Sequence, residues 1–591
     1  MAMIDLSRRF NEAEQAYATG HYQAAAERVG PVLKAMPRHP AVLHLAGLIE
    51  AAMGKQEAAC ALLEKAAKLD PTNAEIRNNL GSQLDRLGKN DAALSHYDAA
   101  LKLSPGRHLT RMNRGIVRQR AGDLAGAIDD LTRAASALGR SAPAWAALGS
   151  ALVAAEDFDA AARAFDTALE INPAHLMAQK GRARVALERA EPGVAEMYQP
   201  LAQDRSDPDI LLGLAEALLA QGLAGQAAAT IADHLAQNPG WMDGRMALYD
   251  LYWEAGDTAK ADALITKLLD EQPQNNTLWE KWLTLLAQSE RFEPLAQYCT
   301  RARATLGDQP FVLVAAMRAA HAQQHVCAAQ EIAEKLDTND AAQRLLLAEH
   351  WLRSGQADRA AATLEPVAKK QLRDVAVWAH LTLAWQLTGD KRYHWVAQQP
   401  GLVTTLQLAL SDDHLVEISQ ILRQLHIARQ HPLAQSMRGG TQTRGRLFAR
   451  IDPAIRRLRD AVLAAVNTYI AGLPPADPTH PLLAFRDTPH VLAGSWSVRL
   501  TKGGRHISHF HPAGWLSSAC YLTNPFESCA DNAIAGRLLI GPPPREWGLK
   551  TIPAATIAPH IGTLALFPSY LWHGTVPTNG GERMTVAFDV R

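Results

Sequence analysis

The sequence predicts a multidomain protein: an all-α superhelix of repeated helix pairs, then a helical linker, then a double-stranded β-helix (jelly roll). Two observations predict this order. Small residues and prolines recur every 34 residues in the first part of the chain, and the apolar period shifts from helical to alternating after about residue 490. At 591 residues, the chain is also too long for one hydrophobic core. We expect repeats in residues 1–395, a linker that can act as a lid in 396–480, and the β domain in 481–591.

The 34-residue period is marked by residue types that a helix–turn–helix unit needs. Within residues 74–107, apolar positions recur at intervals of three and four, and Gly88 lies where the first helix must turn. Ala93 is small enough to let the second helix approach the first, and Pro105 ends the second helix. The same step relates several glycines and alanines along the chain: Gly20, Gly54, Gly88 and Gly122, and Ala25, Ala59, Ala93, Ala127, Ala161 and Ala195.

These marks resemble the tetratricopeptide repeat, whose length and small-residue positions they match. The resemblance covers roughly residues 8–395, weakens after about residue 275, and implies about eleven stacked helix pairs with a concave face. We expect that face to bind a peptide or protein; the alternative is a scaffold that packs only against its own C-terminal domain. The following tryptophans are expected in the core rather than at a ligand: Trp145, Trp241, Trp253, Trp279 and Trp282.

Composition excludes several classes of function. The 60 basic and 60 acidic residues give a net charge of zero, so no global field attracts nucleic acid or an anionic membrane. The five cysteines form no CxxC pair, which suits a reducing compartment. The N-terminus lacks the apolar core of a signal peptide, and no apolar run is long enough to span a membrane. We therefore expect a soluble, cytoplasmic protein without nucleic-acid or membrane partners.

The linker combines helical segments with one polar segment. Asp452 and Pro453 are expected to be the N-cap and first residue of a helix. The polar segment before it carries Arg438, Arg444 and Arg446. It is either a flexible connector or a loop that reaches over the pocket of the next domain.

The last hundred residues consist of short alternating runs separated by glycine, proline and asparagine, which predicts seven or eight strands of a two-sheet jelly roll. In the stretch RHISHFHP, His509 and His511 share one strand face, because side chains two apart point the same way. A third imidazole, from His573 on a later strand, would complete a chelating set. Arg583 and Thr585 share a face of the last strand and suit a carboxylate.

This set resembles the iron(II)- and 2-oxoglutarate-dependent oxygenases of the prolyl-4-hydroxylase-like branch, over about residues 490–591. Members carry H-x-D/E, a distant histidine, and a basic residue about ten positions later. The resemblance implies that Fe(II) is held by His509, His511 and His573, that 2-oxoglutarate is held by Arg583, Thr585 and Tyr521, and that O2 is the second co-substrate.

The resemblance further implies hydroxylation of a C–H bond in a peptide or protein recruited by the repeats, with 2-oxoglutarate converted to succinate and CO2. A small-molecule or natural-product hydroxylase and a non-catalytic interaction scaffold are the alternatives. Arg438, Gln442 and Trp515 are the candidate substrate contacts. Because every candidate ligand follows residue 508, we expect the segment from about 400 to 591 to bind metal and 2-oxoglutarate without the repeats.

The chain departs from the family pattern at His511, which stands where the family has a carboxylate. Three interpretations are open: a three-histidine iron centre, a carboxylate supplied by Asp589 or Asp531, or another metal such as zinc or copper. A site that has lost its chemistry and only binds is the remaining case. We expect His506 and His560 to lie in solvated loops and Cys520 to lie in the core.

Overall fold

The computed structural model describes residues 3–203, 207–433, 435–523, 534–578 and 580–591. The chain divides into two compact units, Met1–Leu201 and Ala202–Arg591. In the part of the chain described, no helix has both the length and the apolar character needed to cross a bilayer.

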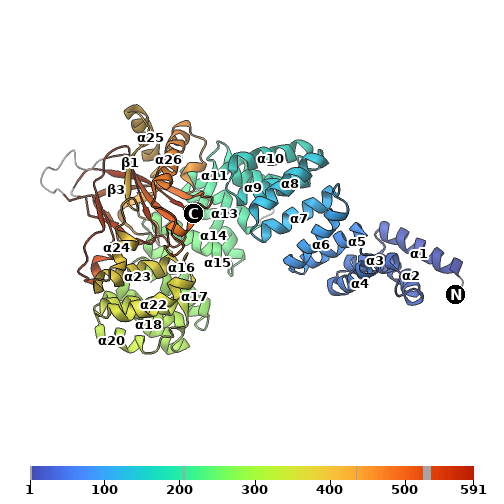
Figure 1. Ribbon diagram of the computed structural model, residues 1–591, viewed down its shortest axis with the longest axis horizontal. Helices are drawn as coiled ribbons and strands as arrows, with labels where there is room; N and C mark the ends of the chain where they lie inside the picture. The colour runs from blue at the N-terminus through green and yellow to red at the C-terminus, as the bar shows by residue number, and fades with distance from the viewer. Residues whose placement is uncertain (1–2, 204–206, 434, 524–533, 579) are drawn as a thin grey trace. The chain divides into compact units, whose positions relative to one another are not determined.

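The first unit is built of consecutive helix pairs, each joined by a short turn (Figure 1). Its described helices are α1 (Met3–Ala18), α2 (Tyr22–Ala35), α3 (Pro40–Ala52), α4 (Gln56–Leu69), α5 (Ala74–Arg86), α6 (Asn90–Leu103), α7 (His108–Arg120), α8 (Leu124–Leu138), α9 (Ala142–Ala154), α10 (Phe158–Ile171), α11 (Leu176–Glu188) and α12 (Val194–Leu201).

Small residues set the distance between the helices of a pair. Ala93 on α6 is fully buried, and so are its counterparts 34 residues away on either side. A Cβ on Gly81 of α5 would lie 2.9 Å from the ring of Tyr97, closer than real side chains approach. The turn after each first helix needs a left-handed residue, which Gly88 supplies at φ +72°. The repeat marks therefore act through sterics that are local to each pair.

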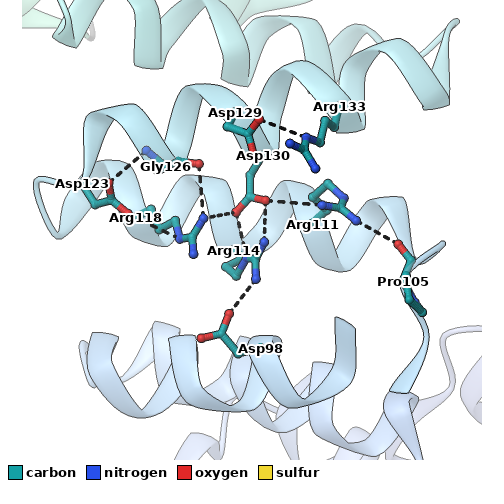
Figure 2. A network of polar contacts seen from close by, with 10 residues as sticks. All are labelled: Asp98, Pro105, Arg111, Arg114, Arg118, Asp123, Gly126, Asp129, Asp130 and Arg133. Atoms are coloured by element: carbon teal, nitrogen blue, oxygen red, sulfur yellow. Dashed lines mark hydrogen bonds and ion pairs between the residues drawn. The ribbon is translucent and has the colours of Figure 1, made fainter. Parts of the chain in front are cut away.

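A network of buried charges lies around Asp130 of α8 (Figure 2). Asp130 is 0% exposed and accepts two hydrogen bonds from Arg114 of α7, at 2.7 and 2.6 Å. Arg118 donates a third at 2.9 Å, and a nitrogen of Arg111 lies 3.8 Å away. Arg114 also donates to Asp98 of α6 at 2.6 Å. The carboxylate thus has a complete set of cationic partners, and the network ties three successive helices together.

The second unit begins with further helix pairs of the same kind. Its helices before the first strand are α13 (Pro208–Ala220), α14 (Ala224–Gln237), α15 (Met242–Glu254), α16 (Thr258–Glu271), α17 (Asn276–Gln288), α18 (Phe292–Leu306), α19 (Pro310–Ala322), α20 (Val326–Ala333), α21 (Ala341–Arg353), α22 (Ala357–Lys370), α23 (Val375–Thr388) and α24 (Arg392–Ala397). In the described chain, eleven pairs run from α1/α2 to α21/α22, which matches the number expected from the repeat.

The expected tryptophan core is confirmed for three residues and wrong for two. Trp253, Trp279 and Trp282 are buried between helices of the second unit. Trp145 and Trp241 are only half-buried. Both lie at the start of the first helix of a pair, where Trp145 donates its indole N–H to the Gly139 carbonyl of the preceding loop at 3.0 Å.

The C-terminal part forms two antiparallel sheets, as the jelly-roll prediction requires. The six-stranded sheet has the order β1-β7-β4-β9-β3-β2, and a three-stranded sheet has the order β6-β5-β8. The described strands are β1 (Thr404–Gln407), β2 (Met437–Gln442), β3 (Leu492–His506), β4 (Leu516–Tyr521), β5 (Leu538–Ile540), β6 (Ala555–Ile557), β7 (Thr563–Pro568), β8 (His573–Thr575) and β9 (Arg583–Val590).

Residues 396–480 contribute to the sheet as well as to the helices. They hold α25 (Asp412–Leu425) and α26 (Pro453–Gly472), which starts at Pro453 as expected, together with β1 and β2 at the two edges of the six-stranded sheet. The polar segment is therefore no flexible connector: β2 lies in it and pairs with β3. Two ion pairs also attach it to repeat turns, Arg444 to Glu254 at 2.6 Å and Arg438 to Glu290 at 2.9 Å.

One hydrophobic core joins the last repeats to the β domain. It runs without interruption from Leu347 on α21 through α22–α26 to Val590 on β9. A cut near residue 400 would divide this core and expose the apolar surface of both halves. The structure therefore speaks against the expectation that residues 400–591 fold and bind ligands alone, because helices before residue 400 cover part of the β domain.

Candidate metal centre

Three histidines from two segments of the chain converge in the β domain. His509, His511 and His573 each contribute one ring nitrogen to a cluster, and these three nitrogen atoms lie within 4.8 Å of one another. His509 and His511 lie between β3 and β4, and His573 is the first residue of β8. The structure thus brings together the three residues that the sequence motif singles out, and no carboxylate joins the group among the residues described.

The backbone explains why these segments meet. His509 and His573 exchange backbone hydrogen bonds, N–H to O at 3.0 and 2.8 Å, as an isolated antiparallel bridge. Gly574 allows this approach, because a Cβ at that position would lie 2.9 Å from backbone atoms of Ser508. A side chain there would force the two histidine-bearing segments apart.

Each imidazole is oriented through its Nδ1 atom. His509 donates from Nδ1 to the Ile507 carbonyl at 2.8 Å, and His573 donates to the Leu571 carbonyl at 3.0 Å. His511 donates from Nδ1 to Oδ1 of Asp589 at 2.5 Å. Because carbonyls and carboxylates only accept, the proton lies on Nδ1 in all three rings, and the Nε2 lone pairs point into the site. Imidazoles that bind metals in proteins are held in this way.

The Nε2 atoms of His509 and His511 are 3.1 Å apart. With both protons on Nδ1, these atoms face each other as two lone pairs, which repel unless a cation or a proton lies between them. A bound cation satisfies this geometry directly. The donor set therefore fits a metal ion better than it fits a structural role in the core.

The surroundings keep the imidazoles of His509 and His573 neutral, as metal binding requires. Burial, with the neighbouring His511, lowers the pKa of His509 to about 3. Burial, with both other histidines, also holds the pKa of His573 well below its usual value.

Helix α23 supports the histidine-bearing segments from behind. Trp572, which precedes His573, donates its indole N–H to the Ala379 carbonyl at 3.1 Å. The ring of His380 packs edge-on against Phe510, at 5.8 Å between centroids, and against Trp572 at 5.6 Å. Phe510 lies between His509 and His511 in sequence. The last repeats thus contact the residues next to all three histidines.

A buried cation lies in the same cavity. Arg583 is 1% exposed, and its Nε and Nη1 atoms have no hydrogen-bond partner in the described chain. The guanidinium carbon lies 5.3 Å from the ring centroid of Tyr521, whose hydroxyl also lacks a partner there. Thr585 lies opposite Tyr521 in the pairing of β9 with β4. A buried guanidinium without an acid partner is destabilising, so this arrangement calls for an anionic ligand.

Arg583, Thr585 and the three histidines line a cavity of about 470 Å³, whereas Tyr521 is not among its lining residues. Its lining includes His506, His509, His511, His573, Arg583, Thr585, Asp589, Trp496, Phe567, Ser436, Arg438 and Gln442, together with Gln288 and Glu290 from the turn between α17 and α18. Of the candidate substrate contacts, Arg438 and Gln442 therefore lie at the cavity. Trp515 does not line it: its indole N–H donates to the Leu482 carbonyl at 3.0 Å, and its ring stacks on His490.

The remaining sequence expectations have mixed outcomes. His560 is exposed and Cys520 is buried, as expected. The expectation for His506 is wrong: it ends β3, is half-buried, and its Nδ1 lies 3.0 Å from the Ser436 hydroxyl, because β2 covers it. Asp589 lies behind His511, and Asp531 lies outside the described residues.

Sequence reasoning missed several cavity residues. Ser436, whose hydroxyl also lies 3.2 Å from Nε2 of His509, precedes the edge strand β2 and carries no motif of its own. Gln288 and Glu290 come from a repeat turn more than 200 positions away in sequence. Glu290 occupies a turn position that glycine fills in other repeats, at φ +56°. Glu156, Ala190 and Gln324 replace glycine at the same turn position, so this replacement alone does not point to the cavity.

Comparison with protein families finds matches in two regions of the chain. Residues 494–589 match the family described as "Putative 2OG-Fe(II) oxygenase". Residues 47–84, 78–143 and 146–199 match tetratricopeptide-repeat families. No curated protein matches the chain.

Solved structures similar to this chain are tetratricopeptide-repeat proteins. A repeat protein from Parabacteroides merdae is 18% identical over 41% of this chain and 97% of its own, with a TM-score of 0.34. YrrB, described as a TPR protein with an unusual peptide-binding site, is 20% identical over 29% of this chain and 90% of its own, with a TM-score of 0.27. MamA from Desulfovibrio magneticus is 20% identical over 29% of this chain and 97% of its own, also with a TM-score of 0.27.

Proposed function

We propose a function on the premise that this chain is a tetratricopeptide-repeat protein with a C-terminal domain of the 2OG-Fe(II) oxygenase family. The domain is an Fe(II)- and 2-oxoglutarate-dependent dioxygenase that hydroxylates a C–H bond. The observation that carries this proposal is one cavity in which three Nε2 lone pairs converge near a buried arginine without an acid partner.

His509, His511 and His573 would hold Fe(II), which supplies O2 activation coupled to the decarboxylation of 2-oxoglutarate to succinate and CO2. Arg583 would donate from its fork of N–H groups to the distal carboxylate of 2-oxoglutarate, beside the hydroxyls of Thr585 and Tyr521. The role of the protein is to orient the co-substrate and the reacting C–H bond and to keep water out.

Asp589 offers an account of the missing carboxylate ligand. The family pattern has a negative charge at the position of His511. Here the negative charge lies behind the imidazole, because Asp589 accepts a hydrogen bond from Nδ1 of His511 at 2.5 Å. A carboxylate in this place raises the basicity of the imidazole and fixes its orientation. Part of the charge would therefore still reach the metal, through the ring.

The proposed substrate is a peptide or protein side chain. Tetratricopeptide repeats present extended surfaces that bind peptides or proteins. The cavity of about 470 Å³ must hold the metal, 2-oxoglutarate and the reacting group, which leaves room for roughly one side chain. Its rim includes Gln288 and Glu290 of the repeats, so a substrate bound there touches both parts of the second unit.

The test is an anaerobic titration of the full chain with Fe(II) and 2-oxoglutarate, followed by visible absorption and, after O2 is admitted, by succinate production. We expect a charge-transfer band in the wild type and in a His560→Ala control, and none in His511→Ala. His511→Asp should keep iron, because aspartate is a competent ligand, but should turn over poorly. Wild-type iron occupancy in His511→Ala, or tight zinc binding without any response to 2-oxoglutarate, would contradict the proposal.

A further inference from the structure

A second hollow lies beside the metal cavity. It has a volume of about 670 Å³ and is formed by the turn between α22 and α23, with Phe485 and Pro512 opposite. Pro512, the residue after His511, lines this hollow and the metal cavity alike. The two hollows therefore adjoin at Pro512. We call the hollow at the turn between α22 and α23 the basic groove.

The basic groove carries three cations close together in sequence: Lys369, Lys370 and Arg373. All three are exposed, and no carboxylate in the described chain forms a salt bridge with any of them. The two nearby acids are engaged elsewhere. Glu365 pairs with Arg392 at 2.8 Å, and Asp374 caps α23 by accepting from the Val377 N–H at 3.0 Å.

Several other cations of the same unit are paired with acids. Arg291 pairs with Asp262 at 2.6 Å, Arg301 with Asp270 at 2.6 Å, and Arg353 with Glu349 at 3.2 Å. The chain as a whole has no net charge. The groove thus differs from these paired sites, because it gathers three cations without a salt bridge in the described chain.

Arg373 is held in place before any ligand arrives. Its guanidinium carbon lies 4.3 Å from the ring centroid of Phe485, a cation–π contact that fixes the long side chain at the floor of the groove. A cation fixed in this way loses little side-chain entropy when it binds an anion.

We propose that the basic groove binds an acidic segment of the substrate polypeptide, next to the residue that enters the metal cavity. This inference rests on the proposed function for the identity of the bound chain as a substrate. A chain that crosses Pro512 places one side chain towards the metal and its neighbours over Lys369, Lys370 and Arg373. Acidic side chains within a few residues of the modified position would then be the recognition feature.

A peptide fits this groove better than a nucleic acid does. Nucleic-acid sites need many phosphate contacts along a basic stripe, whereas the groove has three cations and the surrounding chain is neutral. The wall formed by the turn between α22 and α23 continues the array of helix pairs, an architecture that binds polypeptides.

The binding test uses the metal-free full chain and a fluorescein-labelled 12-residue peptide of alternating Glu and Ala. The comparison peptide has Gln in place of Glu. We expect anisotropy to report binding of the Glu peptide that weakens with salt, and roughly tenfold weaker binding in a K369E/K370E/R373E variant. A K65E/K68E/K102E variant, which changes three exposed lysines of the first unit, should bind as the wild type does.

Three results would contradict the proposed role of the groove: equal binding of the Glu and Gln peptides, an equal loss of binding in both charge-reversal variants, or tighter binding of an oligothymidylate of the same length.

A second experiment separates this inference from the proposed function. When a degenerate peptide library is incubated with Fe(II), 2-oxoglutarate and O2, hydroxylated products should be enriched in acidic residues near the modified position. Succinate formation without that enrichment contradicts the groove alone, whereas groove-dependent peptide binding without 2-oxoglutarate turnover contradicts the proposed oxygenase alone.

Discussion

Each of the two units buries a charged side chain, but only one of these side chains has oppositely charged partners within the protein. In the first unit, Asp130 is fully buried and has hydrogen bonds from Arg114 and Arg118 (Figure 2). In the second unit, Arg583 is just as deeply buried, yet two of its nitrogens have no partner in the described chain. Both charges pay the same kind of desolvation cost. Only for Asp130 do hydrogen bonds from the protein offset that cost.

The difference separates a structural charge from a binding charge. A buried ion whose partners all come from the protein stabilises one arrangement of helices, and its removal should damage folding. A buried ion without protein partners is a site that a ligand completes, and its removal should damage binding. The following predictions test this distinction, from the largest expected effect to the smallest.

Arg583→Ala should raise the dissociation constant for 2-oxoglutarate by two to four orders of magnitude, because losing the partner of a buried ion costs about 3–5 kcal/mol. Fe(II) affinity should change little, since Arg583 is not among the converging nitrogens. Calorimetric titration of 2-oxoglutarate into the iron-loaded protein measures the first quantity, and competition for Fe(II) with a chelator of known affinity measures the second. The 2-oxoglutarate dissociation constant of Arg583→Lys should fall between those of the wild type and Arg583→Ala, because lysine keeps the positive charge but lacks the paired N–H donors of the guanidinium. Unchanged 2-oxoglutarate binding would remove Arg583 from the site.

Asp130→Ala should lower the free energy of unfolding of the first unit by about 3 kcal/mol or more, because it leaves Arg114 and Arg118 facing each other without their acid. Binding of Fe(II) and 2-oxoglutarate should be unaffected. Denaturant unfolding and the titrations above measure the two effects. Asp129→Ala is the matched control, since Asp129 is exposed and pairs with Arg133. If Asp130→Ala and Asp129→Ala unfold alike, the network has no structural role.

Asp589→Asn should weaken Fe(II) binding roughly 10- to 100-fold, because an amide is a poorer acceptor for the Nδ1 proton of His511 and no longer fixes the ring as firmly. The affinity for 2-oxoglutarate at saturating iron should stay near that of the wild type. Competition with a chelator of known affinity gives the first value. Asp487→Asn, at a side chain that is 76% exposed, serves as the control. An unaltered iron affinity would mean that Asp589 does not act through His511.

Trp572→Phe should cost about 1 kcal/mol of stability, because a buried indole N–H···O bond to the Ala379 carbonyl of α23 is lost. The effect should appear in the second unit alone and should be accompanied by a small loss of iron affinity, as His573 is the next residue. Thermal unfolding with and without Fe(II) measures both. The nearby Trp547→Phe variant tests whether the loss follows from the hydrogen bond or from ring size. Equal effects of the two substitutions would assign the loss to packing.

The features that the sequence predicted correctly are those with local causes. The repeat is visible because Ala93, Gly88 and their counterparts are required by the packing of two helices that adjoin in sequence. The β domain is visible because its strands alternate. Arg583 and Thr585 are visible because strand β9 places side chains two positions apart on one face. The expectation that a strand also holds His509 and His511 is wrong, since both lie between β3 and β4 and meet His573 through an isolated bridge.

The features that escaped prediction depend on contacts between distant segments. The strand β2 has an ordinary polar sequence, and only its pairing with β3 makes Ser436 and Arg438 part of the cavity. Trp515 is close to the histidine motif in sequence, but its hydrogen bond to Leu482 and its stacking on His490 hold its ring away from the cavity. Asp589 could be named as a candidate carboxylate, while its position behind His511 required the fold.

The continuous core from Leu347 to Val590 has a consequence for how this architecture can be recombined. A segment whose apolar surface is shared with its neighbour unfolds together with it, so the last repeats and the β domain should behave as one cooperative block. The point at which the chain can be joined to a different array therefore lies upstream of α21, near residue 340, and not where the sequence stops looking helical. A chimera made there would carry the basic groove and the three histidines together, and it would lack Gln288 and Glu290 of the cavity lining.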